Sequence, residues 1–167
     1  MLSRVKAALA VLVAVIFPCS AMALEVPKGK IVLVIKGEQI LRPNVGNTAQ
    51  FDLEMLEALP GRKASMETPW FVGEVSFSGP FLRAVLDAAG AQGSVMRVSA
   101  INKYAAEVPL EDAAMDTILA TRINDKRISV REKGPLFLIY PFDKDPALYN
   151  EKYFNRSVWQ INEIEIR

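Results

Sequence analysis

The chain has 167 residues, with 20 Lys and Arg against 19 Asp and Glu, no His and a single Cys. This near-neutral charge argues against a nucleic-acid partner and offers no basic face to an anionic membrane. The only Cys, Cys19, lies near the N-terminus. The remainder therefore cannot form a disulfide, a Ser-His-Asp triad, a Cys nucleophile or a His- or thiolate-bound metal site.

The N-terminal segment, residues 1–23, predicts a cleavable signal peptide. Arg4 and Lys6 precede an apolar run at residues 7–17, and Ala21-Met22-Ala23 fits a signal-peptidase site. The apolar run is shorter than the roughly 20 residues that a membrane span needs. We therefore expect a periplasmic protein whose residues 24–167 form a single domain. The alternative is a retained N-terminal anchor.

The first half of the chain predicts short, mixed elements. In order, we expect a strand at 31–35, a turn at 42–47, a helix at 53–59 capped by Asp52, a surface loop at 62–69 and a strand at 74–78. Gly79-Pro80 predicts a turn, and the helix that follows at 81–89 carries an apolar stripe and ends at Gly90.

The second half is richer in strand patterns. In order, we expect a strand at 95–101, a polar corner at 102–104, an extended piece to 108, a helical turn at 110–115, a turn at 124–125, a buried strand at 136–140, a loop at 143–150 and a closing strand at 157–167, irregular near Asn162. Strands dominate, so the predicted fold class is α+β with a mixed or barrel-like sheet and a few short helices.

The stretch at residues 97–112 combines these patterns with polar chemistry. Asn102, Lys103 and Tyr104 interrupt an extended apolar segment, which ends at the acidic pair Glu111-Asp112. One interpretation is a β-hairpin corner with solvated polar residues. The other is one wall of a ligand site.

Polar and aromatic side chains near predicted strand ends are the candidates for ligand binding. They are Trp70, Asn102, Lys103, Tyr104, Asp112, Arg122, Lys133 and Tyr140. Each also has a structural interpretation, such as core packing for Trp70 and Tyr140, a surface ion pair for Arg122 or a cap for Asp112. Together they suit a flat heteroaromatic ligand, because a carboxylate accepts paired N–H groups and an aromatic ring offers a stacking face.

Several segments, taken in order, resemble the molybdopterin-binding domain of the sulfite oxidase family in its small exported form. They are FSGPFLRAVL at 77–86, AINKY at 100–104, VPLED at 108–112, ILA at 118–120, GPLFLIYP at 134–141 and SVWQI at 157–161. The resemblance covers roughly residues 31–167 and implies the sulfite-oxidase-type fold.

One departure from the family pattern concerns the metal. In the enzymes that the chain resembles, a Cys thiolate between the first helix and the approach to the second binds molybdenum. Here that region, residues 63–70, reads KASMETPW and has no Cys. The resemblance therefore implies a pterin-size pocket without a metal, and a free or reduced pterin rather than the molybdenum cofactor.

The function implied by the resemblance is pterin binding without catalysis. Ligand occupancy would be relayed to the periplasmic domain of a membrane receptor or sensor, such as one controlling cyclic-di-GMP. The alternatives are a molybdopterin-dependent oxidoreductase or its accessory subunit, and a structural protein whose own side chains fill the pocket.

Overall fold

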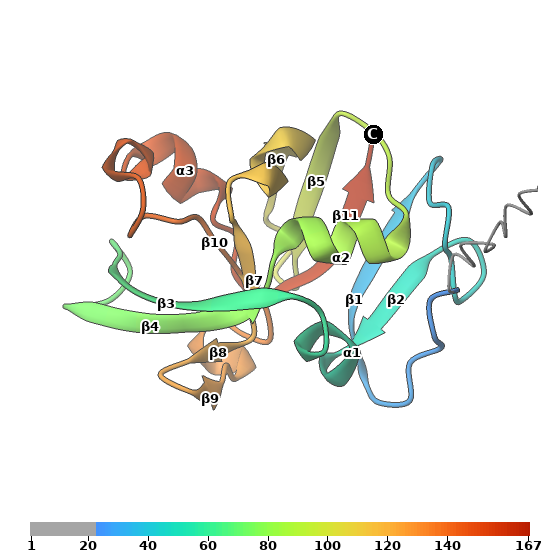
Figure 1. Ribbon diagram of the computed structural model, residues 1–167, viewed down its shortest axis with the longest axis horizontal. Helices are drawn as coiled ribbons and strands as arrows, with labels where there is room; N and C mark the ends of the chain where they lie inside the picture. The colour runs from blue at the N-terminus through green and yellow to red at the C-terminus, as the bar shows by residue number, and fades with distance from the viewer. Residues whose placement is uncertain (1–22) are drawn as a thin grey trace, which may run out of the picture.

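The computed structural model describes residues 23–167, and the predicted signal peptide falls almost entirely outside them (Figure 1). The largest sheet has five strands in the order β2-β1-β11-β5-β6. These strands are β1 (Ile31–Gly37), β2 (Ala49–Asp52), β5 (Val95–Ala100), β6 (Ala105–Pro109) and β11 (Ile161–Ile166). The sheet is mixed, since β1 and β11 run parallel and the other neighbours are antiparallel.

A second sheet has the order β3-β4-β8-β9 and is entirely antiparallel. Its strands are β3 (Gly61–Glu67), β4 (Glu74–Pro80), β8 (Arg122–Ile123) and β9 (Lys126–Arg127). The β3–β4 hairpin is long and extends away from the five-stranded sheet (Figure 1). A separate pair joins β7 (Ile118–Ala120) to β10 (Phe137–Ile139).

The helices are short. They are α1 (Leu53–Glu57), α2 (Leu82–Ala89) and α3 (Glu151–Arg156), with 3₁₀ turns η1 (Leu110–Ala114), η2 (Val130–Glu132) and η3 (Pro146–Leu148). In the described part of the chain, no helix has the length and apolar character needed to cross a bilayer.

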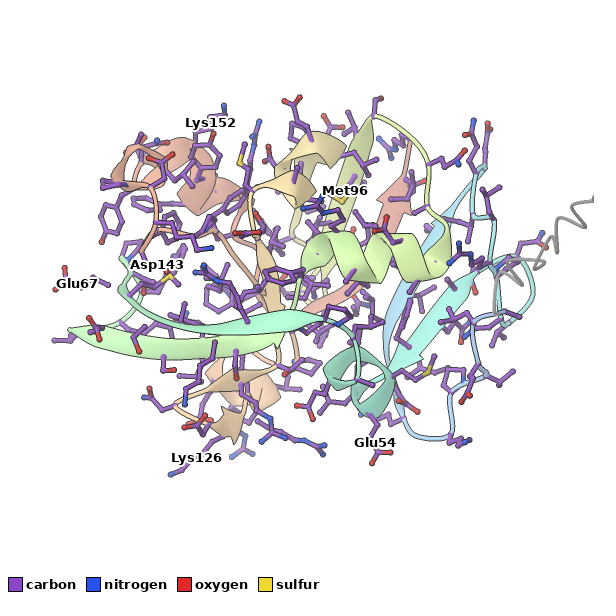
Figure 2. All side chains as sticks on the ribbon, viewed as in Figure 1. Glu54, Glu67, Met96, Lys126, Asp143 and Lys152 are labelled. Carbon is purple, nitrogen blue, oxygen red and sulfur yellow. The ribbon has the colours of Figure 1, made fainter. Side chains whose placement is uncertain are left out.

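Local sequence explains where α1 and α2 begin or end. The Asp52 carboxylate caps α1 by accepting the Met55 N–H at 2.9 Å. Helix α2 ends at Gly90, whose φ of 62° is left-handed, as a helix C-terminus often requires. The apolar stripe of α2 is buried as predicted, and Met96 of β5 belongs to the same core (Figure 2).

Two local predictions were wrong. Residues 62–69 were expected to be a surface loop, but 61–67 form β3, paired residue by residue with β4. Gly79-Pro80 was expected to be a turn, but β4 runs through both residues. A Cβ on Gly79 would lie 2.1 Å from the Leu119 carbonyl oxygen, so this glycine serves a close strand crossing and not a turn.

The C-terminal part also departs from the expected elements. The polar stretch at 143–150 contains η3, and α3 follows it without having been predicted. Asn150 starts α3 by accepting the Lys152 N–H at 3.0 Å. The closing strand begins only at Ile161, and its predicted irregularity near Asn162 is confirmed by a register shift against β5 between Ile161 and Glu163.

Candidate functional site

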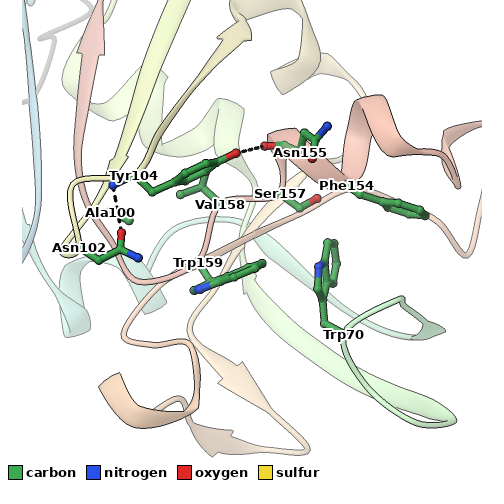
Figure 3. A pocket seen from close by; sticks show the side chains of 9 residues that line it. All are labelled: Trp70, Ala100, Asn102, Tyr104, Phe154, Asn155, Ser157, Val158 and Trp159. Atoms are coloured by element: carbon green, nitrogen blue, oxygen red, sulfur yellow. Dashed lines mark hydrogen bonds between the residues drawn. The ribbon is translucent and has the colours of Figure 1, made fainter.

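A cavity of about 270 Å³ opens beside α3, where three distant parts of the chain meet (Figure 3). The turn between β5 and β6 contributes Asn102 and Tyr104, and the loop between β3 and β4 contributes Trp70. The remaining wall comes from the C-terminal end of α3 and the residues after it. These are Phe154, Asn155, Ser157, Val158 and Trp159, and Ala100 completes the lining.

The β5–β6 turn is held in shape by its own hydrogen bonds. The Asn102 Oδ1 accepts the Tyr104 N–H at 3.0 Å, and the Lys103 N–H donates to the Ala100 carbonyl at 3.0 Å. Lys103 adopts a left-handed φ of 71°, which the tight turn requires. The Asn102 Nδ2 donates no hydrogen bond among the described residues, so this amide can still donate to a ligand.

Tyr104 connects this turn to α3. Its hydroxyl donates to the Asn155 carbonyl at 3.1 Å, and about half of the residue remains exposed. The ring therefore forms one wall of the cavity while its polar end is already bonded (Figure 3).

The opposite side of the cavity is aromatic. Trp70 packs edge to face against Phe137 at 5.1 Å between ring centroids, and its centroid lies 6.3 Å from that of Trp159. Trp159 also packs against Phe137, at 5.9 Å. The Lys133 ammonium lies 4.2 Å from the centroid of the Trp159 ring, which places a cation on that ring next to the cavity.

Two other predicted site residues, Asp112 and Tyr140, do not line this cavity. Both are buried, and the Tyr140 hydroxyl donates to the Asp112 Oδ2 at 2.6 Å. Arg156 donates to the same oxygen at 2.9 Å. Burial, and next the bond to Asp112, raise the pKa of Tyr140 far above its usual range. The Asp112 carboxylate, which was predicted to bind the edge of the ligand, is therefore bonded to Tyr140 and Arg156 instead.

Arg122 also lies away from the cavity. Its guanidinium forms a two-pronged pair with Glu57, at 2.9 Å to Oε1 and 3.1 Å to Oε2. Burial opposes charge on Glu57, but the hydrogen bonds from Arg122, Thr121 and Arg127 outweigh it and lower the pKa of this carboxyl. Arg122 therefore forms an ion pair with Glu57, as its structural interpretation predicted, and does not take part in the cavity.

Trp159 and the end of α3 were missing from the predicted site. The alternating pattern at 157–167 made Trp159 one apolar residue of a strand, and α3 had not been recognised. The sequence signal that could have predicted α3 is Asn150-Glu151, because Asn is a strong helix N-cap and an acidic residue is favoured in the first turn of a helix.

The donor atoms present do not fit a molybdenum centre of the thiolate type. Residues 24–167 contain no Cys and no His, and residues 23–167 hold no cluster of three or more acidic side chains arranged around a common point. The cavity does fit a flat ring, since it combines indole and phenol walls with the amides of Asn102 and Asn155.

Fold and cavity together define an α+β domain with an aromatic-walled cavity. The chain belongs to the family described as oxidoreductase molybdopterin binding domain, whose model matches residues 45–166. The resemblance inferred from sequence is therefore confirmed, and the match spans every residue that lines the cavity.

Among solved structures, the chain is similar to the sulfane dehydrogenase SoxCD from Paracoccus pantotrophus. The TM-score is 0.59 at 18% sequence identity, over 80% of this chain and 37% of that one. This likeness shows the sulfite-oxidase-type fold, and the chain corresponds to little more than a third of the SoxCD chain. No curated protein matches this chain.

Proposed function

We propose that this protein is a periplasmic pterin-binding protein without catalytic activity of its own, which relays ligand occupancy to a membrane signalling partner. The observation that carries the proposal is the cavity that joins Trp70, Trp159 and Tyr104 to the amides of Asn102 and Asn155. A pterin is flat and has hydrogen-bonding edges, so it needs stacking faces and a few placed polar groups.

The size of the cavity supports a small ligand. Its volume of about 270 Å³ lies just below the range typical of small-molecule sites, about 300–1,000 Å³. A free pterin suits this space better than a complete molybdenum cofactor, which also requires a metal ligand that residues 24–167 do not supply.

The relay part of the proposal rests on the loop that carries Trp70. Trp70 lines the cavity, while Val72, two residues later, is fully exposed. A ligand that stacks on Trp70 would restrain this loop and so change the surface around Val72. The proposed partner is the periplasmic domain of a receptor that controls cyclic-di-GMP.

Native mass spectrometry of protein purified from its own host tests the proposal, together with metal analysis. We expect a pterin mass, pterin fluorescence and no stoichiometric molybdenum. Added tetrahydropterin at about 100 times its Kd should stabilise the protein by about 2.7 kcal/mol in thermal unfolding. Stoichiometric molybdenum, or no response to any pterin, would overturn it.

A second candidate is a molybdopterin-dependent oxidoreductase or its accessory subunit. It is favoured by the family match over residues 45–166 and by the fold likeness to a sulfane dehydrogenase. This function predicts bound molybdopterin and electron transfer to an added acceptor, neither of which the first proposal expects.

A further inference from the structure

Strand β3 leaves one complete edge of the second sheet unpaired. It stands first in the order β3-β4-β8-β9 and pairs only with β4. Its sequence, GRKASME, alternates between exposed residues at 61, 63, 65 and 67 and more buried residues at 62, 64 and 66. The open edge is seven residues long, which is long enough to accept another strand.

The hydrogen-bond register tells which backbone groups face that open edge. The Phe81 N–H donates to the Pro60 carbonyl at 2.9 Å, so the Gly61–Pro80 pair is a non-bonded pair of the antiparallel ladder. The bonded pairs therefore involve residues 62, 64 and 66. The backbone groups of residues 61, 63, 65 and 67 point away from β4, and no hydrogen bond within residues 23–167 uses them.

The charges on this edge are arranged with opposite signs four residues apart. Lys63 and Glu67 are exposed and share one face of the strand. Glu67 lies directly opposite Glu74 across the hairpin, a like-charge pair that destabilises the end of the sheet. Lys63 pairs with Asp125 of the β8–β9 turn at 2.7 Å, but both side chains are more than half exposed, so this pair contributes little and Lys63 can turn to a new partner. Neither glutamate has an ion-pair partner in the described part of the chain. Glu67 stands at the far end of the hairpin (Figure 2).

We propose that two copies of this chain associate through β3, antiparallel, about a twofold axis at Ser65. In this register Ser65 faces Ser65 of the second copy, and Lys63 of each copy faces Glu67 of the other. All of these residues have backbone groups that face outward, so the paired edges can form about six new hydrogen bonds. The association requires no pterin.

Charge favours this register over the others that the outward-facing residues allow. A twofold axis at Lys63 would place lysine against lysine, and one at Glu67 would place glutamate against glutamate, both of which are unfavourable. An axis at Ala64 or Met66 would place neither Lys63 nor Glu67 opposite a charge of the other sign. The Ser65 axis instead forms two opposite-charge pairs and offsets the repulsion between Glu67 and Glu74. Pro69, which has no N–H, ends the ladder.

Sedimentation velocity across the micromolar range tests the proposal, on protein purified after expression of the full chain. Wild type should show a concentration-dependent dimer. Glu67→Lys and Lys63→Glu should each weaken dimerisation by about tenfold or more, because both symmetric contacts become like-charge pairs. Glu67→Lys also replaces the repulsion from Glu74 with attraction, so it should not unfold the protein.

Mixing the Glu67→Lys and Lys63→Glu variants provides the decisive test. Every contact across a mixed dimer is again between opposite charges, so the mixture should associate although each variant alone does not. Ser65→Pro should also abolish the dimer while leaving the monomer folded, since the Ser65 N–H faces outward. Lys126→Glu, on β9 at the other edge of the sheet, is the matched control and should dimerise as wild type does.

Three results would overturn the proposal. They are a wild type that stays monomeric throughout the concentration range, a dimer that Glu67→Lys does not weaken, and a mixture that fails to associate.

Discussion

Asn155 and Arg156, consecutive residues of α3, belong to two polar regions, of which one is open to solvent and the other is buried. The Asn155 carbonyl accepts the Tyr104 hydroxyl at the rim of the open cavity, whereas Arg156 reaches the buried carboxylate of Asp112. In the buried cluster of Asp112, Tyr140 and Arg156, the polar ends bond to one another. Among the residues that line the cavity, the Asn102 Nδ2 and the Asn155 side chain form no hydrogen bond within residues 23–167.

This difference separates a structural role from a recognition role. A buried carboxylate that already has two partners stabilises the fold and leaves little capacity for a ligand. An open site with aromatic walls and spare donors can bind a ligand without losing internal bonds. The following variants should therefore change stability in one region and affinity in the other.

Asp112→Ala should give the largest effect. It leaves Tyr140 and Arg156 without their shared acceptor, so we expect a loss of about 3 kcal/mol in the free energy of unfolding, measured by urea titration. Asp116→Ala removes a more exposed carboxylate, paired with Lys144 at 2.7 Å, and should cost less than about 1 kcal/mol. Equal losses in the two variants would contradict the structural role of Asp112.

Trp159→Ala should weaken pterin binding by roughly ten- to hundredfold, because stacking on an aromatic side chain contributes about 1–3 kcal/mol. Isothermal titration calorimetry measures the change. Tyr149→Ala is the control, since Tyr149 packs on Phe154 at 4.9 Å but does not line the cavity. An unchanged affinity in Trp159→Ala would remove this ring from the site.

Alkaline unfolding should report on Tyr140. Its pKa is raised above the ordinary 10.0 by burial and by the bond to Asp112, so the folded state keeps the proton that the unfolded state releases. Stability is therefore complete below pH 10 and falls above it, by up to about 1.4 kcal/mol per pH unit from this group. Urea titrations near pH 9 and pH 11 should show this extra loss in wild type and in Tyr149→Phe but not in Tyr140→Phe.

Asn102→Asp should have the smallest effect, about 1 kcal/mol in pterin affinity with no change in Tm. The aspartate keeps the oxygen that accepts the Tyr104 N–H but loses the free Nδ2 donor. Asn124→Asp is a matched control, because Asn124 similarly accepts the Ser76 N–H at 3.1 Å but lies in the β8–β9 turn. A drop in Tm in Asn102→Asp alone would point to a role in the turn.

Much of the fold could be predicted from local patterns. The alternation of Val75 and Phe77, the stripe of α2 and the apolar run before Pro141 each identify an element, because burial of one face requires that periodicity. Strand β3 could not be predicted in this way. Its exposed positions are polar, and its pairing with β4 supplies the order that its own sequence lacks.

The candidate site was predictable only in part. Trp70, Asn102 and Tyr104 line the cavity, and the Lys133 ammonium lies on the Trp159 ring at its border. Asp112, Tyr140 and Arg122 had the right chemistry but bond to other groups of the protein. Sequence spacing cannot tell a free carboxylate from a bonded one, because Asp112 and its partner Arg156 are 44 residues apart.

By itself, the sequence determined the class of the protein and the limits on its chemistry. The order of its short motifs identified the family, and the lack of Cys and His in residues 24–167 excluded a thiolate-bound metal, since no other side chain supplies that ligand. Only the tertiary structure decided which polar residues meet. It brought Trp70, Asn102 and Trp159 to one cavity and closed Asp112 against Tyr140, because contacts between distant segments determine which groups remain open to a ligand.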